Sequence, residues 1–478
     1  MGNRPRTASI HILDDDSLLH IFYLYRPFLL GEDEDGNARL WGGNRLWVSG
    51  HWWYKLAHVC KRWRNVLLVS ASYLGLSLVC THGTPVADML AHSLPLPLVV
   101  DYSEEGRNIT AEDEEGIILA LNQRDRLRRV RFHLPATSLQ KFTAAIEEEY
   151  PILEYLIISF PTEDKSTILI FSEAFQAPLL RHLTLGGFAL PIGSRILTTA
   201  VGLVTLSLAM VHPSTYFHPN TLLQWISLMP QLETLAIYFE FPIPNRDVER
   251  QLTHMPIIAP VTLPNLHYFS FHGVSTYLEA LVRRVTAPRL EKIDIDFFNR
   301  LMFFVPHLQQ LTNTAENLRF DSARFRFSDK KVYVTIYPNE EFELYPLSII
   351  VLCWHLDWQV SSVTQISNSL SQILSAVERL TLEHEEHSQS SEEHNQVDRT
   401  NWRQLLKPFS NVKTLLIESG LVEELSRCLQ SEDGEPPLEL LPELQELTYV
   451  GSGDTGGGFT SFINARQNAG RPVTLVRG

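Results

Sequence analysis

One short phrase recurs along this chain and limits the folds open to it. The pattern Pro-x-Leu-x-x-φ-x-φ, in which φ is apolar, occurs six times, as PILEYLII, PLLRHLTL, PQLETLAI, PNLHYFSF, PRLEKIDI and PELQELTY. Looser copies without the proline have their first apolar position at Leu127, Leu203, Ala315, Leu347, Val377 and Val412. Successive copies lie 23 to 35 residues apart. Such self-similarity is typical of repeat proteins and is hard to explain as independent strands of one compact sheet.

Each copy predicts one β-strand that is followed by a helix. The φ-x-φ alternation sends alternate side chains to one face of a strand, so stacked copies would bury a continuous core. The residues between copies carry helical patterns such as TLLQWISLM and YLEALVRRV. We therefore expect an α/β fold, with parallel strands on the concave face and helices on the convex face of an irregular solenoid.

Three segments interrupt the repeats. FRFSDKKVYVTIYP, at 325–338, alternates like an added hairpin, and the polar stretch at 384–398 reads as a solvated loop. The tail TSFINARQNAGRPVTLV predicts one closing helix, with Gly470 near its C-cap, and a final strand. A terminal cap of this kind shields the end of a repeat core.

The amino-terminal part carries two apolar stripes. Asp14, Asp15 and Asp16 precede the first, within DDDSLLHIFYLYR, and Pro27 ends it. The second, LAHVCKRWRNVL, places its apolar residues from Leu56 to Leu67 at helical spacing, so it predicts one helix. An ordinary core helix is the plainer interpretation, but two such short helices cannot close a core alone.

The segments ILDDDSLLHIF and LAHVCKRWRNV resemble an F-box, the helical motif that docks on the Skp-family adaptor of SCF ubiquitin ligases, and the region after them is similar to fungal (basidiomycete-type) F-box proteins. Leu13-Asp14 stands where the family has Leu-Pro, and an inserted loop near 28–52 separates the two pieces. The resemblance implies adaptor contact by a mostly apolar set of residues. These are Leu13, Leu18, Leu19, Ile21, Phe22, Leu56, Val59, Cys60 and Trp63.

The repeats resemble a leucine-rich-repeat solenoid, the commonest companion of an F-box, although they lack its regular Asn or Cys after the third apolar position. We expect a disordered tail at 1–8, the F-box with its inserted loop at 9–75 and a connecting segment at 76–120. The solenoid with its C-terminal cap would occupy 121–478.

Composition excludes several classes of partner. A formal charge of −15 argues against nucleic acid and anionic membranes as partners. Four cysteines without CxxC spacing favour a reducing compartment. The first residues lack a signal peptide, and the longest apolar run, near Leu347, is too short to span a bilayer. We expect a cytoplasmic or nuclear protein, or one found in both.

No catalytic constellation is visible. The His- and Glu-rich stretch at 384–394 is not HExxH and has no apolar shell, so it predicts an acidic loop and not a metal site. The glycine-rich GSGDTGGG, at 451–458, lacks the Lys-Ser/Thr of a phosphate-binding loop. We predict no catalytic residue, no cofactor and no metal.

Residues between the two apolar positions of each strand would line one face and meet a protein target. The candidates are Tyr155, His182, Thr184, Thr205, Thr234, Tyr268, Ser270, Lys292 and Asp294, and plain solvated surface is the alternative for each. The resemblance implies a substrate-recognition subunit that joins an unknown protein target to the adaptor and, through it, to a cullin. The alternatives are a repeat scaffold with a vestigial F-box and, less favoured, an enzyme whose site the sequence does not reveal.

Overall fold

The computed structural model describes residues 13–26 and 52–478, apart from 105, 147, 161–168, 192, 213–215, 241–258, 302–304, 316, 319, 339–344, 386–396, 431–438 and 451–457. The chain divides into two compact units, Met1–Leu203 and Val204–Gly478. The expected tail at 1–8, nearly all of the inserted loop, and most of the polar and glycine-rich segments lie outside the described residues.

The first unit opens with helices α1 (Asp15–Tyr25), α2 (Trp52–Ala57), α3 (Lys61–Val69) and α4 (Ala71–Leu74). Asp14 caps α1, as expected, because its carboxylate accepts the backbone N–H of Ser17 at 2.7 Å. The prediction of one helix through LAHVCKRWRNVL is wrong. The chain turns at His58 and Val59, and Cys60 becomes the N-cap of α3, its sulfur accepting from the N–H of Trp63.

Parallel strands follow in the same unit, and helices accompany them. The main sheet has the order β1 (Leu78–Cys80), β2 (Leu98–Tyr102), β3 (Leu127–His133), β4 (Tyr155–Ser159), β6 (His182–Gly186). A small pair joins β5 (Leu169–Ile170) to β7 (Phe188–Ala189), and the helices are α5 (Val86–His92), α6 (Ala111–Leu121), α7 (Ala136–Ala145) and α8 (Ile196–Thr199). Because β1 and β2 pair with each other and β2 with β3, the sheet begins inside the segment expected to be a connection.

The second unit repeats the alternation of strand and helix. Its strands are β8 (Thr205–Val211), β9 (Thr234–Phe239), β10 (Val261–Thr262), β11 (Tyr268–Gly273), β12 (Val285–Thr286), β13 (Lys292–Phe297), β14 (Ser322–Phe327), β15 (Lys331–Tyr337), β16 (Leu347–Leu352), β17 (Arg379–His384), β18 (Thr414–Glu418), β19 (Glu446–Val450) and β20 (Thr474–Arg477). Its helices are α9 (Pro219–Ser227), α11 (Ser275–Val282), α12 (Pro306–Thr314), α13 (Leu356–Ser369), α14 (Ser371–Leu374), α15 (Arg399–Leu406), the short 3₁₀ turn η4 (Ser419–Leu421), α16 (Val422–Leu429) and α17 (Thr460–Asn468).

The sheet of this unit is mostly parallel, in the order β8-β9-β11-β13-β16-β15-β14-β17-β18-β19-β20. The predicted hairpin is confirmed, since β14 and β15 pair antiparallel within it. Among the described residues between Ala315 and β14, none lies in a strand. The register predicted from Leu347 is wrong, because Leu347 is itself the first buried residue of β16, and Ile350 and Leu352 are partly exposed.

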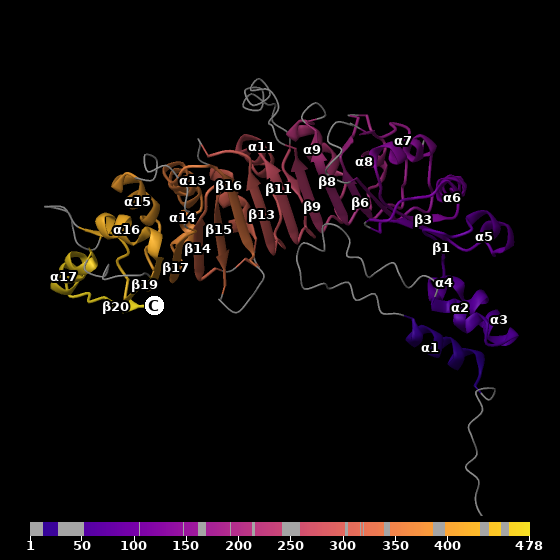
Figure 1. Ribbon diagram of the computed structural model, residues 1–478, viewed down its shortest axis with the longest axis horizontal. Coiled ribbons are helices and arrows are strands. Elements are labelled where there is room, and N and C mark those ends of the chain that lie inside the picture. Colours follow the sequence, from indigo (N-terminus) through magenta and orange to yellow (C-terminus); the bar gives the residue numbers. More distant parts are fainter. Residues whose placement is uncertain are drawn as a thin grey trace, which may run out of the picture. The chain divides into compact units, whose positions relative to one another are not determined.

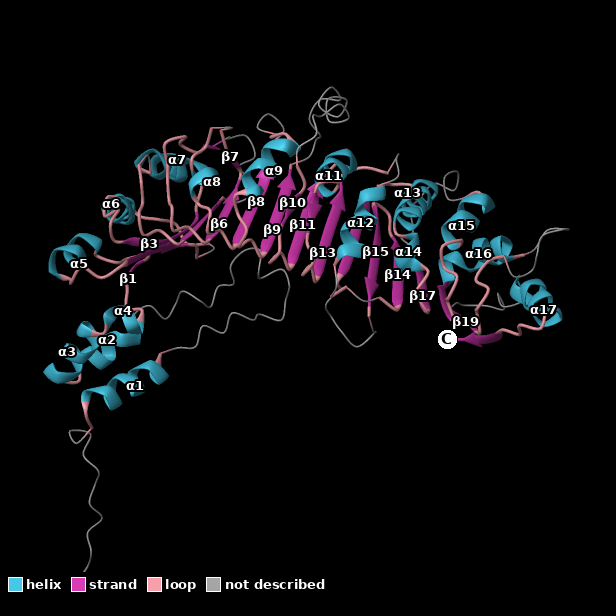
Figure 2. Cartoon of the chain, turned by 180° about the vertical axis from the view of Figure 1, so that it is seen from behind, coloured by secondary structure: helices cyan, strands magenta, loops and turns pink. Residues whose placement is uncertain are grey.

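One face of each strand is buried against the helices. In β13 and β16 alternate residues are buried, and the residues between them are partly exposed. Figure 2 shows the helices of the second unit in front of its strands, and Figure 1 shows the opposite face, over which no described helix lies. We call this face, and the corresponding face of the first unit's sheet, the open face, although in the first unit its β1–β2 end is buried at Val79 and Val99.

The C-terminal cap depends on a buried arginine. Arg466, on α17, is fully buried and donates to the carbonyls of Leu441, Pro442 and Leu444 at 2.9–3.0 Å. Leu441 has a positive φ of 50°, which disfavours a branched side chain, so the guanidinium holds a strained turn just before β19. The predicted closing helix and final strand are confirmed as α17 and β20, with Gly470 at φ 75°.

Replacing Arg466 by Met should lower the free energy of unfolding by roughly 3 kcal/mol, since the carbonyls of Pro442 and Leu444 lose their donor in a largely buried site and the carbonyl of Leu441 keeps only the N–H of Leu444. Urea unfolding of the full chain measures it. Arg471→Gln is the control, because the ion pair between Arg471 and Glu443 is solvent-exposed and should contribute less than about 1 kcal/mol. Equal effects of the two substitutions would contradict this role of Arg466.

Candidate interaction surfaces

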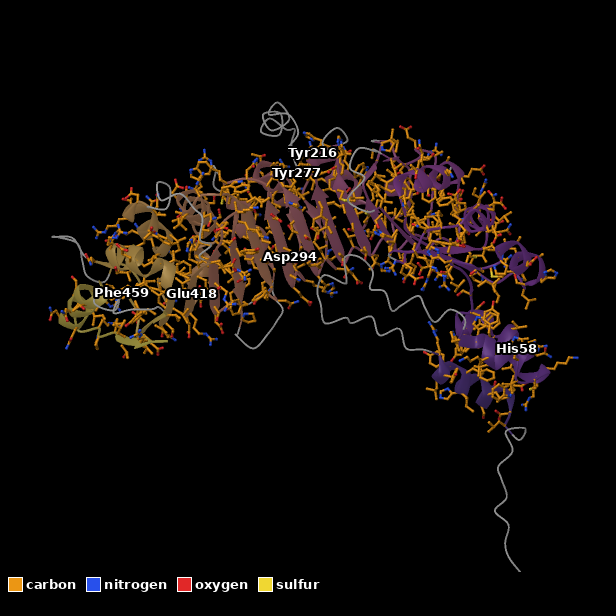
Figure 3. The ribbon with its side chains drawn as sticks, in the orientation of Figure 1. His58, Tyr216, Tyr277, Asp294, Glu418 and Phe459 are labelled. Carbon is orange, nitrogen blue, oxygen red and sulfur yellow. The ribbon has the colours of Figure 1, made fainter. Side chains whose placement is uncertain are left out.

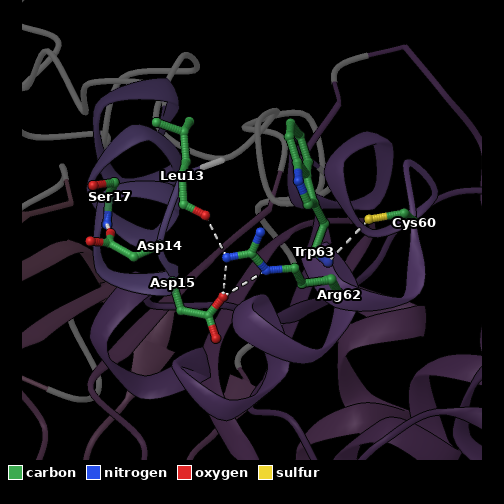
Figure 4. Close-up of polar contacts among 7 residues, drawn as sticks. All are labelled: Leu13, Asp14, Asp15, Ser17, Cys60, Arg62 and Trp63. Carbon is green, nitrogen blue, oxygen red and sulfur yellow. Dashed lines mark hydrogen bonds and ion pairs between the residues drawn. The ribbon is translucent and has the colours of Figure 1, made fainter. Parts of the chain in front are cut away.

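The amino-terminal helices form a small folded motif with its own core. Leu18 and Phe22 are fully buried, and the ring of Phe22 meets Trp63 edge-on at 5.0 Å between centroids. Arg62, on α3, bonds to the start of α1. Its guanidinium donates to the Leu13 carbonyl at 2.6 Å and pairs with the Asp15 carboxylate at 2.8 Å (Figure 4).

The residues expected to contact an adaptor do not share one environment. Ile21 and Val59 are exposed, at 41% and 57%, whereas Leu18 and Phe22 are inside the motif. Leu13, Leu19, Leu56, Cys60 and Trp63 are half-buried. Cys60 has a structural role as a helix cap.

Sequence reasoning missed other exposed apolar residues in this motif. They are Tyr23, Leu24, Tyr25, Val69 and Tyr73, each at least 44% exposed. A second stripe on α1, with Ile21, Leu24 and Tyr25 at i, i+3 and i+4, was the available signal. An exposed apolar surface of this kind marks a site of interaction.

The open face of the first unit carries a stacked row of side chains. Register pairs Arg129 of β3 with Tyr155 of β4, and Tyr155 with His182 of β6. The Arg129 guanidinium lies 4.4 Å from the Tyr155 ring centroid, and the Tyr155 and His182 rings stack at 4.3 Å. Burial, with the neighbouring cations Arg129 and Arg181, lowers the pKa of His182 to about 4, so its ring is neutral at pH 7.

On the open face of the second unit, polar contacts link β9, β11 and β13. Tyr268 donates to the Asp294 carboxylate at 2.7 Å, and Lys292 lies 3.3 Å from the same carboxylate. Tyr238 and Ser270 share a hydrogen bond of 2.7 Å. Figure 3 labels Asp294, which lies on the strands of this unit and not among its helices.

One pair on this face is poorly satisfied. His272 Nε2 lies 3.7 Å from an Asp296 oxygen, yet His272 Nε2 and the other Asp296 oxygen, Oδ1, are shielded from water without a hydrogen-bond partner among the described residues. Burial lowers the pKa of His272 to about 4 and raises the pKa of Asp296 to about 6, although Lys331 opposes the second shift. The two groups are therefore a neutral imidazole and a desolvated carboxylate at pH 7, and not an ion pair.

The predicted target-binding residues all lie on the open faces, but three of them are buried. Thr184, Tyr268 and Ser270 are at most 7% exposed. Thr184 and Ser270 are small side chains that their larger cross-strand neighbours cover. Tyr268 lies against Asp294 and Lys292. Tyr155, His182, Thr205, Thr234, Lys292 and Asp294 are half-buried. Sequence reasoning missed Arg129 and Asp296. Arg129 would have been found by following the alternation to the preceding strand, and Asp296 by following it two residues beyond Asp294.

Two further features were sought in the part of the chain that the structure describes. No three potential ligands among His, Cys, Asp and Glu come together there as a metal site would require. Within those same residues, no helix has both the length and the apolar character needed to cross a bilayer.

Replacing Asp296 by Asn should stabilise the chain at pH 7 by about 1 kcal/mol, after discounting for solvent screening. The pKa of the folded state lies above that of the unfolded state, so the carboxylate destabilises the fold above about pH 6. The gain should disappear as the pH falls below about 4, where both states are protonated. Urea unfolding between these limits measures it.

Asp294→Asn is the matched control two residues away. It weakens the hydrogen bond from Tyr268 and removes the ion pair with Lys292, so it should destabilise the chain at pH 7. The interpretation fails if Asp296→Asn destabilises the chain at pH 7 as Asp294→Asn does.

Comparison with known proteins adds no relative. No protein-family model matches the chain, and none of the curated proteins matches it. Two kinds of surface on this chain are candidates for binding a partner: the exposed apolar residues of the amino-terminal helices and the polar open faces of the two units.

Proposed function

We propose that this chain is the substrate-recognition subunit of an SCF-type ubiquitin ligase and has no catalytic residues of its own. Its amino-terminal helices would bind a Skp-family adaptor and, through it, a cullin, while its open faces hold a protein target. The observation that supports this most is the exposed apolar surface of a motif that is already folded around Leu18, Phe22 and Trp63. An interface core needs such anchors, with cations at its rim.

The geometry also accounts for the departure from the F-box pattern at Leu13-Asp14. In place of a proline, Asp14 caps α1 and Arg62 anchors the Leu13 carbonyl, so the entry to the helix is fixed by hydrogen bonds. Val59 and Cys60 lie in the turn between α2 and α3, which leaves Val59 accessible. These contacts support an intact docking motif.

The remainder of the chain would be an irregular leucine-rich-repeat solenoid interrupted by the β14–β15 hairpin. Parallel strands with one face on helices and one face open support it. Ubiquitin transfer would then depend on proximity, because a held target has a raised effective concentration at the transfer site. The cytoplasm or nucleus is the compartment in which we expect the protein to work.

The alternative is a repeat scaffold whose F-box no longer binds an adaptor. One observation favours it: Leu18 and Phe22, two of the expected contact residues, are fully buried inside the motif. Under this alternative the open faces would still bind protein, but no ubiquitin would be transferred.

Co-purification of the full chain with a Skp-family adaptor tests the proposal. The double substitution Ile21→Asp, Val59→Asp should weaken adaptor binding about tenfold or more, because it places charge in an apolar interface without touching the motif's core. Leu179→Asp, an equally exposed leucine of the same unit, should bind like the unchanged chain. If the unchanged chain fails to bind the adaptor, the scaffold alternative replaces the proposal.

A further inference from the structure

A row of side chains crosses the sheet of the first unit at one register level. It runs from Val79 of β1 through Val99, Arg129 and Tyr155 to His182 of β6. The two valines are only 6% exposed, so the accessible part of the row is its cationic and aromatic end. The parallel register fixes this order, since each residue lies beside its partner on the next strand.

Positive charge gathers around this end of the row. Arg129 and Arg131 both project from β3, and Arg131 is only 7% exposed. Burial lowers the pKa of both guanidinium groups because their charges are incompletely solvated. Arg26 and Arg128 are close enough to Arg129 to lower its pKa further.

Among the residues that the structure describes, the carboxylates near the row are fewer than the cations. Glu154 is held by Arg128 at 2.9 Å, and Asp101 lies beside Arg131 in the register. Arg181, next to His182, is exposed. In a chain with a formal charge of −15, such a local excess of cations is a feature of this surface and not of the protein as a whole.

We propose that the Arg129–Tyr155–His182 row binds an acidic segment of a protein partner. This inference rests on the proposed target-binding role of the open face and names the chemistry of the segment that binds. A carboxylate placed at the row would meet the Arg129 guanidinium, which already lies 4.4 Å from the Tyr155 ring centroid, so little side-chain entropy is lost on binding. Partly desolvated cations also attract an anion more strongly than solvated ones do.

Fluorescence anisotropy with the full chain tests the proposal. The probe is a fluorescein-labelled dodecapeptide of alternating glutamate and alanine, and the neutral control peptide replaces each glutamate by glutamine. The acidic peptide should bind, the neutral peptide should not, and affinity should fall as salt rises from about 50 to 200 mM. Failure of the acidic peptide to bind, or equal binding of the neutral one, would overturn the proposal.

Substitutions locate the site. Arg129→Gln should weaken binding about tenfold, and Arg129→Lys should weaken it less, because Lys keeps the charge but not the contact of a guanidinium with the Tyr155 ring. Arg181→Gln, at an exposed position, is a second variant that should fold whatever Arg129 contributes to stability. Lys141→Gln is the control, because Lys141 is an exposed cation of the same unit that pairs with Glu114. Unchanged affinity in both arginine-to-glutamine variants would refute the site.

The pKa of His182 reports on binding at this row, because a peptide attracted to another part of the chain would not change it. In the free chain its pKa is held near 4 by burial and by Arg129 and Arg181, against Glu154. A bound carboxylate should raise this pKa, as measured by NMR of ¹³C-histidine-labelled chain and assigned with His182→Gln. No change of the His182 pKa on saturation with peptide would place the binding elsewhere and overturn the proposal.

Two further measurements separate the possible failures. A single-stranded oligonucleotide of equal charge should bind more weakly than the acidic peptide, and tighter binding would replace the protein segment by a nucleic acid as the ligand. Adaptor co-purification is measured on the same preparation. Peptide binding without adaptor binding refutes the ubiquitin-ligase function and leaves the acidic-segment site intact, and the reverse result refutes only the site.

Discussion

The parallel register of the strands is the constraint on which the rest of this structure depends. Pairing of β3, β4 and β6 residue by residue places Leu156 beside Leu183 on the covered face and Tyr155 beside His182 on the open face. A slip of one residue would exchange the two faces and expose the apolar side chains. Burial of the alternating leucines and isoleucines therefore fixes the position of every polar residue between them.

The same register brings charged and polar groups together where they are incompletely solvated. Arg129 and Arg131 of the first unit, and His272 and Asp296 of the second, sit where neighbouring side chains exclude water. Each has a pKa displaced by burial, in the direction that disfavours its charged form. A surface whose cations and carboxylates are incompletely solvated is prepared to bind charged groups of a partner, which links the packing of the sheets to the proposed recognition role.

The amino-terminal helices are held together differently from the sheets. Their core is small, and polar contacts complete it. Arg62 joins the start of α1 to α3, and Cys60 begins α3 in place of continuing α2. The break at His58–Cys60 turns Val59 outward, so the apolar stripe that looked continuous in the sequence is divided between two helices. Exposed apolar residues on both α1 and this turn are the features that a partner would cover.

The sequence by itself determined the alternation of strand and helix, because φ-x-φ periodicity and helical stripes are local patterns that tertiary contacts here reinforce. It also determined the cap of α1 at Asp14, the β14–β15 hairpin, and the closing helix α17, since each depends on residues close together in the chain. For the candidate residues of the open faces, the sequence predicted the face of the sheet on which each lies, but not how much of its side chain is exposed.

Only the tertiary structure decided the rest. The break between α2 and α3 arises because the cap at Cys60 and the contacts of Phe22 with Trp63 outweigh a continuous helical stripe. The start of the sheet at β1, the register of β16, and the stack of Arg129, Tyr155 and His182 all depend on residues distant in sequence. Local periodicity assigns a side chain to a face, but its neighbours across the strands set its solvation and therefore its charge.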